Sequence, residues 1–422
     1  MSGLGFSASI VLLVASFVLN ALVLAYRWPR LPSVRRRVDA LQQRLTRRPD
    51  WTWLRLEHIL LPLVVLAGVN VLWQVSTLHC GDDSLALLAS GQAVLHGQNP
   101  FVVDYCGYTA HPIPYGLPAV LLNTLGAIGD HVAGIWIVWE AVALAVVPLV
   151  WLVAGEDRRY LTVLAATSVV YLPNLATDIG LDNAIVPVAV LAMLYALEVA
   201  RRRRGWYVGL AAFLSTARFP AVFPLLGAAG ADRRARVRGL AIVIGVFAAT
   251  VAVSYLLWGW DAIGIVYLGQ FSRTSGGSLN FFAVLLVEGW YPPTLASSAL
   301  QGAALLALVA WVSARGYSTR AASAIPILGV LLLSQYTNFH FFVWLVPLFL
   351  LGPSVRAWLL LLGTGAALDT ILAGQYLGET LGVWWPYERA GIVLTALLLY
   401  LLLRIALDEE ARRRSGTIAA VS

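Results

Sequence analysis

The sequence contains no lysine, and charged residues of every kind make up only 12% of its 422 residues. The 29 basic residues are therefore all arginine, and the formal net charge is +7. Hydrophobic residues account for 59% of the chain, which is more apolar surface than a water-soluble domain of this length can hide. This composition predicts a polytopic protein surrounded by membrane lipids, and it argues against nucleic-acid binding despite the basic charge.

Several chemical motifs are missing as well. The chain has no glycine-rich phosphate loop, no serine-nucleophile motif and no dinucleotide fingerprint. Its histidine and acidic residues show no metal-site spacing, so we expect neither a cofactor nor a metal ion. The only two cysteines, Cys80 and Cys106, fall in one predicted external loop. In an oxidising compartment they could form a disulfide across that loop, and two unpaired buried thiols are the alternative.

The arginines indicate the orientation, because cytoplasmic loops carry the excess of basic residues. The basic stretch 27–48 is predicted to be cytoplasmic, either as a helix lying on an anionic leaflet or as a solvated linker. With residues 27–48 placed in the cytoplasm, only Arg273 and Arg389 among the exposed arginines face outward. The eleven expected spans are residues 4–26, 58–77, 133–154, 160–177, 183–200, 239–258, 294–313, 321–338, 341–352, 357–373 and 389–407.

Two apolar segments do not fit as full spans. Residues 206–230 begin and end at predicted cytoplasmic arginine clusters, so they must cross the membrane an even number of times. About 25 residues cannot cross twice at ~20 residues per span. We therefore predict a helical hairpin broken at Arg218-Phe219-Pro220, where proline removes a helical donor. Residues 113–129 are short and contain two prolines, and we expect them to form a helix in the external interface.

The predicted fold is thus an all-α polytopic membrane protein with about eleven transmembrane helices, a broken helical hairpin and an external loop with interfacial helices. Residues 1–56 would form an N-terminal span and a basic cytoplasmic segment. Residues 57–407 would form the catalytic transmembrane domain, and residues 408–422 a cytoplasmic tail. The arginine-rich, alanine-rich usage points to a bacterial plasma membrane, and we expect a monomer.

The external loop carries the best candidates for catalysis, Asp82 and Asp83. An acidic pair before an apolar run is typical of a helix N-terminus, where one side chain caps free amides. Capping does not account for both carboxylates. The second role we assign is that of a general base, which takes the proton of a poorly nucleophilic sugar hydroxyl as a new bond forms.

Two arginines are candidates for an anion site. Arg218 lies at the turn of the predicted hairpin, where a charged residue is costly and therefore functional by default. A guanidinium matches a pair of phosphate oxygens well. Arg273, in a glycine-rich external loop, is the second candidate. Snorkelling to headgroups is the alternative for Arg218, and a solvated loop for Arg273.

Other external residues could contact a sugar. His111, His340, Trp384 and Trp385 lie on the predicted external side, where tryptophan ordinarily forms an interfacial belt and lone histidines are ordinarily structural. Tryptophan is also a residue that stacks on sugar rings. Glu140, inside a predicted span, is expected to hydrogen-bond with a neighbouring helix.

Several motifs occur along this chain in the same order as in a known family, which they resemble. The run from Asp83 through Gly97, Asn99, Pro100 and Phe101 resembles the first external loop of glycosyltransferase family 87, in the GT-C superfamily of polyprenyl-phosphate-sugar-dependent enzymes. Counted back from Gly97, the family's aspartate falls on Asp83. Phe101 departs from the family, which has tyrosine there.

Four further matches extend the resemblance to residues 55–355. Tyr115 lies in a Tyr/Pro-rich approach to the next helix, and Asp182-Asn183 in a Gly-x-x-Asn turn whose family glutamine is replaced by Leu181. Arg218-Phe219-Pro220 resembles the family's Lys-x-Pro hairpin, with arginine in place of lysine. His340 lies in a turn similar to a later histidine-bearing one. The resemblance implies substrate-binding roles for Tyr115, Asp182, Asn183 and His340, and His111, Trp384 and Trp385 are further substrate-binding candidates because of their predicted external position.

The resemblance implies an enzyme with a GT-C-like fold that moves a hexose, mannose by preference, from a polyprenyl-phosphate sugar donor to a glycolipid or glycan acceptor on the external face. Asp83 would act as base, with inversion at the anomeric carbon. Two other classes remain: a lipid-linked sugar flippase or transporter, and a non-catalytic membrane subunit. Transporters often contain inverted repeats, and the sequence shows no repeat.

Overall fold

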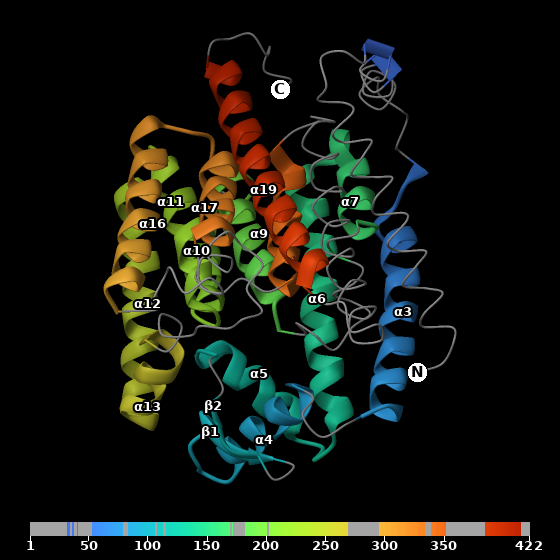
Figure 1. Ribbon diagram of the computed structural model, residues 1–422, viewed down its shortest axis with the longest axis vertical. Coiled ribbons are helices and arrows are strands. Elements are labelled where there is room, and N and C mark those ends of the chain that lie inside the picture. The colour runs from blue at the N-terminus through green and yellow to red at the C-terminus, as the bar shows by residue number, and fades with distance from the viewer. Residues whose placement is uncertain are drawn as a thin grey trace.

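The computed structural model describes residues 32–33, 36–37, 40, 53–78, 83–105, 108–112, 115–168, 171, 182–200, 202–268, 295–333, 339–351 and 385–414. These residues are predominantly helical (Figure 1). Three of their helices are long and apolar enough to cross a membrane, namely α3 (Leu56–Ser76), α6 (Val132–Ala154) and α12 (Arg236–Trp258). The protein is therefore a helical, membrane-associated protein. The spans predicted at 4–26 and 357–373 lie outside the described residues.

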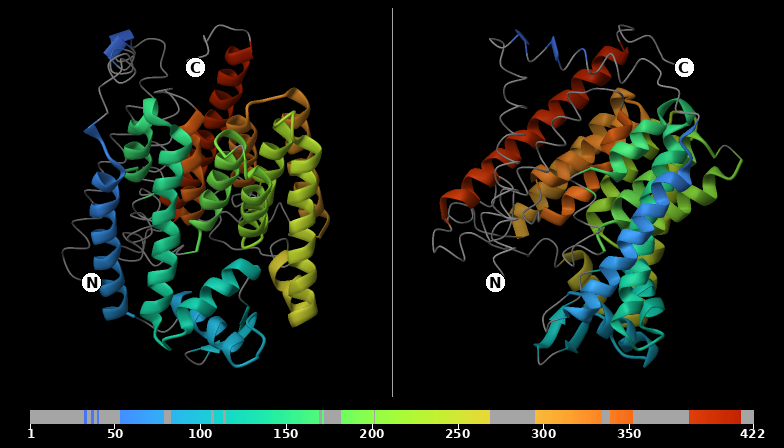
Figure 2. Two further views of the ribbon diagram at one scale, coloured as in Figure 1. Left: turned by 180° about the vertical axis from the view of Figure 1, so that it is seen from behind. Right: turned by 90° about the vertical axis from the view of Figure 1, so that its right-hand side faces the viewer.

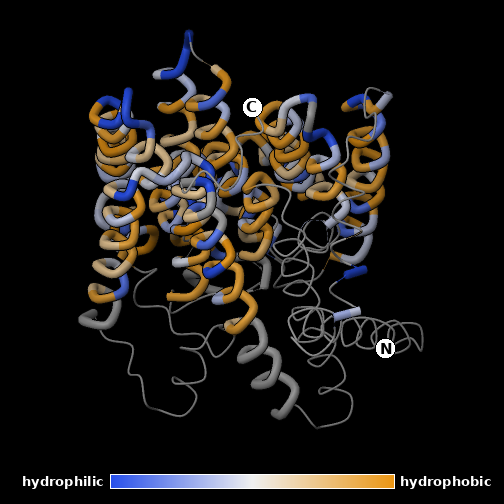
Figure 3. The backbone as a smooth tube through the Cα atoms, turned by 90° about the horizontal axis from the view of Figure 1, so that it is seen from above, coloured by the Kyte–Doolittle hydropathy of each residue, from blue (hydrophilic) through white to orange (hydrophobic). Residues whose placement is uncertain are grey.

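The three long helices have different positions in the bundle. At 1.5 Å per residue, helices of 21 and 23 residues measure ~32 to ~35 Å, which matches the hydrocarbon thickness. The most apolar stretch of α6 is 44% buried, whereas that of α12 is only 17% buried. Consequently α6 packs inside the protein, while α12 presents most of its surface to the surroundings. Figure 3 shows that the described helices are coloured mainly as hydrophobic.

A small unit lies apart from the helical bundle, at the lower edge of Figures 1 and 2. This outer unit consists of α4 (Asp83–Leu95), β1 (Val102–Tyr105), β2 (Tyr108–Pro112) and α5 (Leu117–Ala127). Its two strands are antiparallel, with Val103 opposite His111. We did not expect strands here, although valine, tyrosine and threonine favour them. α5 has 11 residues, too few to span the membrane, as we predicted for this segment.

Glycines allow the helices of the outer unit to pack closely. A Cβ on Gly91 of α4 would lie 2.3 Å from the carbonyl oxygen of Asn123 in α5. A Cβ on Gly134 of α6 would lie 2.1 Å from the carbonyl oxygen of Gly126, also in α5. Neither approach leaves room for a side chain, so the backbones are in contact. Trp139 of α6 also donates a hydrogen bond of 3.0 Å to the Asn123 side chain. The outer unit is thereby fixed to α6.

The remaining elements range from three to 30 residues in length. They are η2 (Glu156–Arg158), α7 (Arg159–Ala166), α9 (Ile185–Glu198), α10 (Arg204–Ser215), η3 (Phe219–Ala221), α11 (Val222–Ala231), α13 (Trp260–Ile263), the π-helix η4 (Gly264–Leu268), α16 (Leu295–Arg315), α17 (Thr319–Leu333), the 3₁₀-helix η5 (Phe339–Leu351) and α19 (Trp385–Arg414). Most overlap the predicted spans, but a helix of 14 residues such as α9 reaches only ~21 Å. Several helices therefore end part-way through the bundle.

The predicted broken hairpin is confirmed. α10 ends at Ser215, η3 begins at Phe219, and the intervening Arg218 has an extended backbone with φ −131° and ψ 108°. The guanidinium of Arg204, at the start of α10, donates to the carboxylate of Asp232, just after α11, at 2.8 Å. Because these two residues are in contact, the hairpin begins and ends at the same end of the molecule. We call this end, which carries residues 202–204, 233–238 and 320, the arginine-rich end.

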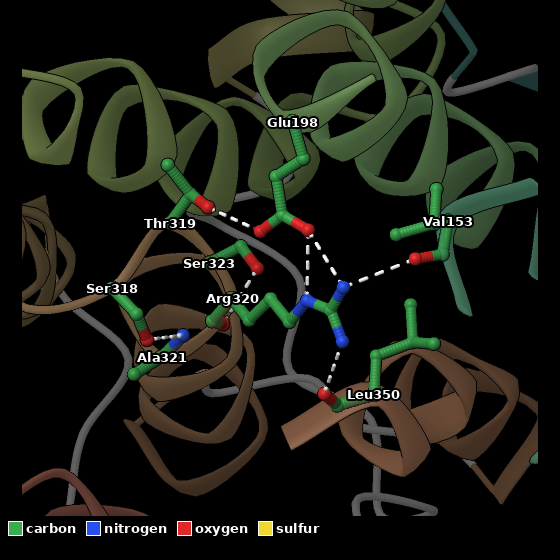
Figure 4. Close-up of polar contacts among 8 residues, drawn as sticks. All are labelled: Val153, Glu198, Ser318, Thr319, Arg320, Ala321, Ser323 and Leu350. Atoms are coloured by element: carbon green, nitrogen blue, oxygen red, sulfur yellow. Dashed lines mark hydrogen bonds and ion pairs between the residues drawn. The ribbon is translucent and has the colours of Figure 1, made fainter. Parts of the chain in front are cut away.

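One arginine holds four helix ends together there (Figure 4). Arg320 of α17 pairs with Glu198 of α9 at 2.8 Å. Its other donors reach the carbonyl oxygens of Val153 in the last turn of α6, at 3.0 Å, and of Leu350 in the last turn of η5, at 3.1 Å. Arginine is favourable at helix C-termini because it satisfies their unpaired carbonyls and their dipole. Arg320 therefore aligns these helices.

The topology can be tested by labelling single cysteines in a Cys80→Ser/Cys106→Ser background. Arg202→Cys and Arg234→Cys should react with an impermeant maleimide only from the cytoplasm, because the two positions flank one hairpin. Gly129→Cys, between α5 and α6 with no atom within 4 Å of its Cβ, should react only from outside. Labelling of Arg202→Cys and Arg234→Cys from opposite sides would contradict the hairpin.

Candidate functional site

The site begins with a buried ion pair at the hairpin turn. Arg218 donates from Nε to the Oδ2 atom of Asp182 at 2.8 Å, and one of its terminal nitrogens donates to the same oxygen. The side chains are only 8% and 5% exposed. Asp182 lies just before the first residue of α9, a helix of only 14 residues. Two residues that the sequence analysis named separately are thus in direct contact.

Two aromatic rings enclose the guanidinium. The Arg218 guanidinium carbon lies 4.5 Å from the ring centre of Tyr115, which precedes α5. It lies 5.3 Å from the ring centre of Phe341, near the start of η5. A guanidinium over an aromatic face is stabilised by the ring quadrupole, more strongly where water is excluded. The site is therefore built by four segments that are far apart in the sequence.

The outer unit meets the hairpin at Gly116. Its backbone N–H donates to the carbonyl oxygen of Ala217 at 2.9 Å. A Cβ at position 116 would lie 1.9 Å from the carbonyl oxygen of Thr216. Only glycine allows this approach, which places the neighbouring Tyr115 against Arg218. The backbone at 115–116 therefore couples the outer unit to the ion pair.

Asn183 adds an unsatisfied amide. Its side chain is fully buried and follows Asp182 directly. Neither its amide nitrogen nor its amide oxygen has a hydrogen-bond partner among the residues that the structure describes. A buried polar group without a partner costs about 1–3 kcal/mol. Such a group next to an ion pair marks a place where a polar ligand would be stabilised.

A second polar cluster joins α3 to α6. Asn70 donates to Glu140 at 2.7 Å, and Gln74 donates to Asn70 at 3.3 Å. This confirms the prediction that Glu140 bonds with a neighbouring helix. The sequence analysis did not include Asn70 and Gln74, although two amides one turn apart in an apolar helix were a visible signal. They stabilise a carboxylate that lies in an apolar environment.

The remaining candidates have different positions. Asp83 is exposed and is the first residue of α4, so the helix-terminus interpretation is consistent with its place. His111 lies on β2, His340 in η5, and Trp385 begins α19, but their side chains lie outside the described part of the structure. Asp82, Arg273, Trp384 and both cysteines also lie outside it. No group of three or more metal-ligating side chains occurs in the described ranges.

Comparison with known proteins adds no assignment. The chain matches no protein-family model and no curated protein.

The contact at Gly116 can be tested by a single methyl group. Gly116→Ala should lower stability by about 1–3 kcal/mol, because the Cβ forces the outer unit away from the hairpin. Thermal unfolding in detergent measures the loss. Gly129→Ala is the matched control, since no atom lies within 4 Å of its added Cβ. Equal melting temperatures for the two variants would contradict the close contact.

Proposed function

We propose that this chain is an integral membrane glycosyltransferase of the bacterial plasma membrane. It would move a hexose, mannose by preference, from a polyprenyl-phosphate sugar to a glycolipid or glycan acceptor on the external face. One observation carries the proposal: a buried arginine–carboxylate pair at the turn of a broken hairpin, in contact with the outer unit through Tyr115. Charged groups at such depth in a membrane protein are ordinarily functional.

The pair supports a site for a lipid phosphate. Asp182 neutralises Arg218 in the absence of a ligand, which offsets much of the cost of burying the guanidinium. A donor phosphate would then share the guanidinium with Asp182 or displace its carboxylate. Tyr115 and Phe341 limit the movement of the guanidinium, so its direction toward the ligand is set in advance. Asn183 would supply a donor and an acceptor for a sugar hydroxyl.

The reaction follows from the donor's own chemistry. The acceptor hydroxyl oxygen attacks the anomeric carbon while Asp83 takes its proton. The bond from that carbon to the phosphate oxygen breaks, and polyprenyl phosphate leaves with the electron pair. Attack from the face opposite the leaving group inverts the anomeric centre. The positive charge of Arg218 would stabilise the negative charge that grows on the leaving phosphate.

Purified full-length protein tests the proposal directly. Incubation with polyprenyl-phosphate-mannose and total membrane lipid should produce a new mannosylated lipid, detected by mass spectrometry, and should release polyprenyl phosphate. Retention of all the mannose on the donor, with every membrane lipid and glycan fraction supplied, would overturn the proposal.

A flippase for lipid-linked sugars is the second candidate, since buried charges part-way through a bundle are also typical of transport proteins. The two functions give different results in proteoliposomes. A flippase moves the labelled donor across the bilayer without breaking its phosphate bond. A transferase releases polyprenyl phosphate, with or without such movement.

A further inference from the structure

A groove of about 720 Å³ lies at the arginine-rich end, between the start of α12 and the end of α16. Four of the eight residues that line it are arginines, and none is acidic. Its lining consists of Arg233, Arg234, Ala235, Arg236, Val237, Arg238, Ala241 and Ala314. This groove is separate from the Arg218–Asp182 site, which shares no residue with it.

The arginines divide into one that builds the groove and three that face outward. Arg236 donates to the carbonyl oxygens of Gly230 at 2.6 Å and of Ser313 at 2.9 Å, so it ties α11 to α16. Arg233, Arg234 and Arg238 are exposed. The neighbouring carboxylate of Asp232 is engaged by Arg204 at 2.8 Å and is not part of the groove lining. Among the described residues, the lining of the groove therefore carries a net positive charge.

The start of α12 adds to this charge. The helix begins at Arg236, and its N-cap is Ala235, whose side chain cannot accept a hydrogen bond from the first-turn amides. Unpaired amides and the helix dipole both favour an anion at such a place. Guanidinium forks together with helix amides suit the non-bridging oxygens of a phosphate.

An apolar surface begins where the groove ends. Ala241, in the groove lining, lies on the exposed side of α12, which continues with Ile244 at 58% exposure. Val237, at the start of α12, is 82% exposed, and Trp206, at the start of α10, is 73% exposed. Figure 2 shows α12 at the edge of the bundle, where lipid can reach it. A ligand with one phosphate and long apolar chains fits both surfaces together.

We propose that this groove binds the phosphate headgroup of an anionic phospholipid, whose acyl chains lie along the exposed face of α12. The inference depends on the apolar helices being embedded in lipid, and it is independent of sugar transfer. Binding there would hold the ends of α11, α12 and α16 in place.

Native mass spectrometry of delipidated full-length protein, titrated with phosphatidylglycerol, tests this proposal. The variant Arg233→Gln/Arg234→Gln/Arg238→Gln should bind phosphatidylglycerol about 10²-fold more weakly than wild type. The reason is that each of the three arginines contributes a similar share of the binding free energy for an anionic lipid. Arg236 is kept because it is structural. Wild type should prefer phosphatidylglycerol to phosphatidylcholine, and added salt should reduce that preference.

The matched control Arg202→Gln/Arg203→Gln/Arg404→Gln removes the same charge from exposed arginines outside the groove lining and should bind like wild type. Equal weakening in both triple variants would overturn a specific site, as would equal affinity for the two lipids. Displacement of the lipid by millimolar inorganic phosphate would assign the groove to a soluble phosphate instead. If the groove variant does not fold, the salt and lipid comparisons on wild type decide alone.

Discussion

Arg218→Met is expected to lower stability by about 3–5 kcal/mol and to abolish use of the lipid-phosphate donor. The substitution leaves the Asp182 carboxylate buried without its partner, and it removes the positive charge proposed to meet the phosphate. Thermal unfolding in detergent gives the first effect, and donor saturation kinetics give the second.

The double variant Arg218→Met/Asp182→Leu separates structure from function. Replacing both charges by apolar side chains of similar size should recover most of the stability, because neither charge then remains buried alone. Donor use should stay absent. A stable double variant with wild-type transfer would make the pair purely structural, and Arg273 would become the better candidate for the phosphate ligand.

Donor saturation by the Arg218→Lys variant should lie between that of wild type and that of Arg218→Met. Lysine keeps the positive charge but loses the two-pronged fork that reaches Asp182, and it stacks less well on Tyr115 and Phe341. We therefore expect weaker donor saturation than in wild type and clearly better saturation than in Arg218→Met, measured in the same assay.

Asp83→Asn is expected to reduce sugar transfer by ~10²-fold or more, with little change in stability. Asparagine keeps the size of the side chain and still caps a helix, but it cannot take a proton from the acceptor. The measurement is the single-turnover rate with saturating donor. Because Asp83 is exposed at the start of α4, the variant should fold normally.

Asp82→Asn is the matched control one residue earlier, and it should retain most of the transfer rate. Near-normal transfer by Asp83→Asn together with a large loss in Asp82→Asn would move the base to Asp82. Normal transfer by both variants would make the acidic pair structural, and the flippase proposal would then be preferred.

The broken hairpin could be predicted without coordinates, because it depends on counting. Residues 206–230 lie between two arginine clusters that are both predicted to be cytoplasmic, and the interval is too short for two crossings. Pro220 cannot donate a backbone hydrogen bond, which favours a break there, whereas Pro224 lies inside α11 in the structure. Local properties of the chain thus determined the hairpin, and the structure confirms it in η3 and in the bond from Arg204 to Asp232.

The strand pair of the outer unit was not predicted, although its residues favour it. β1 and β2 are four and five residues long, so their alternation is too brief to stand out from the helical segments around them. A pair of strands is stable only when it packs against something else. Val103 is buried in a small cluster with Ala86 and Ala93 of α4, and this packing is invisible in the local pattern.

By itself, the sequence determined the apolar helices, the arginine-rich end, the hairpin and the chemical types of the candidate residues, since each follows from composition or from spacing along the chain. Only the tertiary structure decided which candidates meet. Arg218 and Asp182 are 36 positions apart, and Asn70 and Glu140 are 70 positions apart. Contacts over such separations arise from the packing of whole helices, where close approaches such as that of Gly116 to Thr216 select one arrangement.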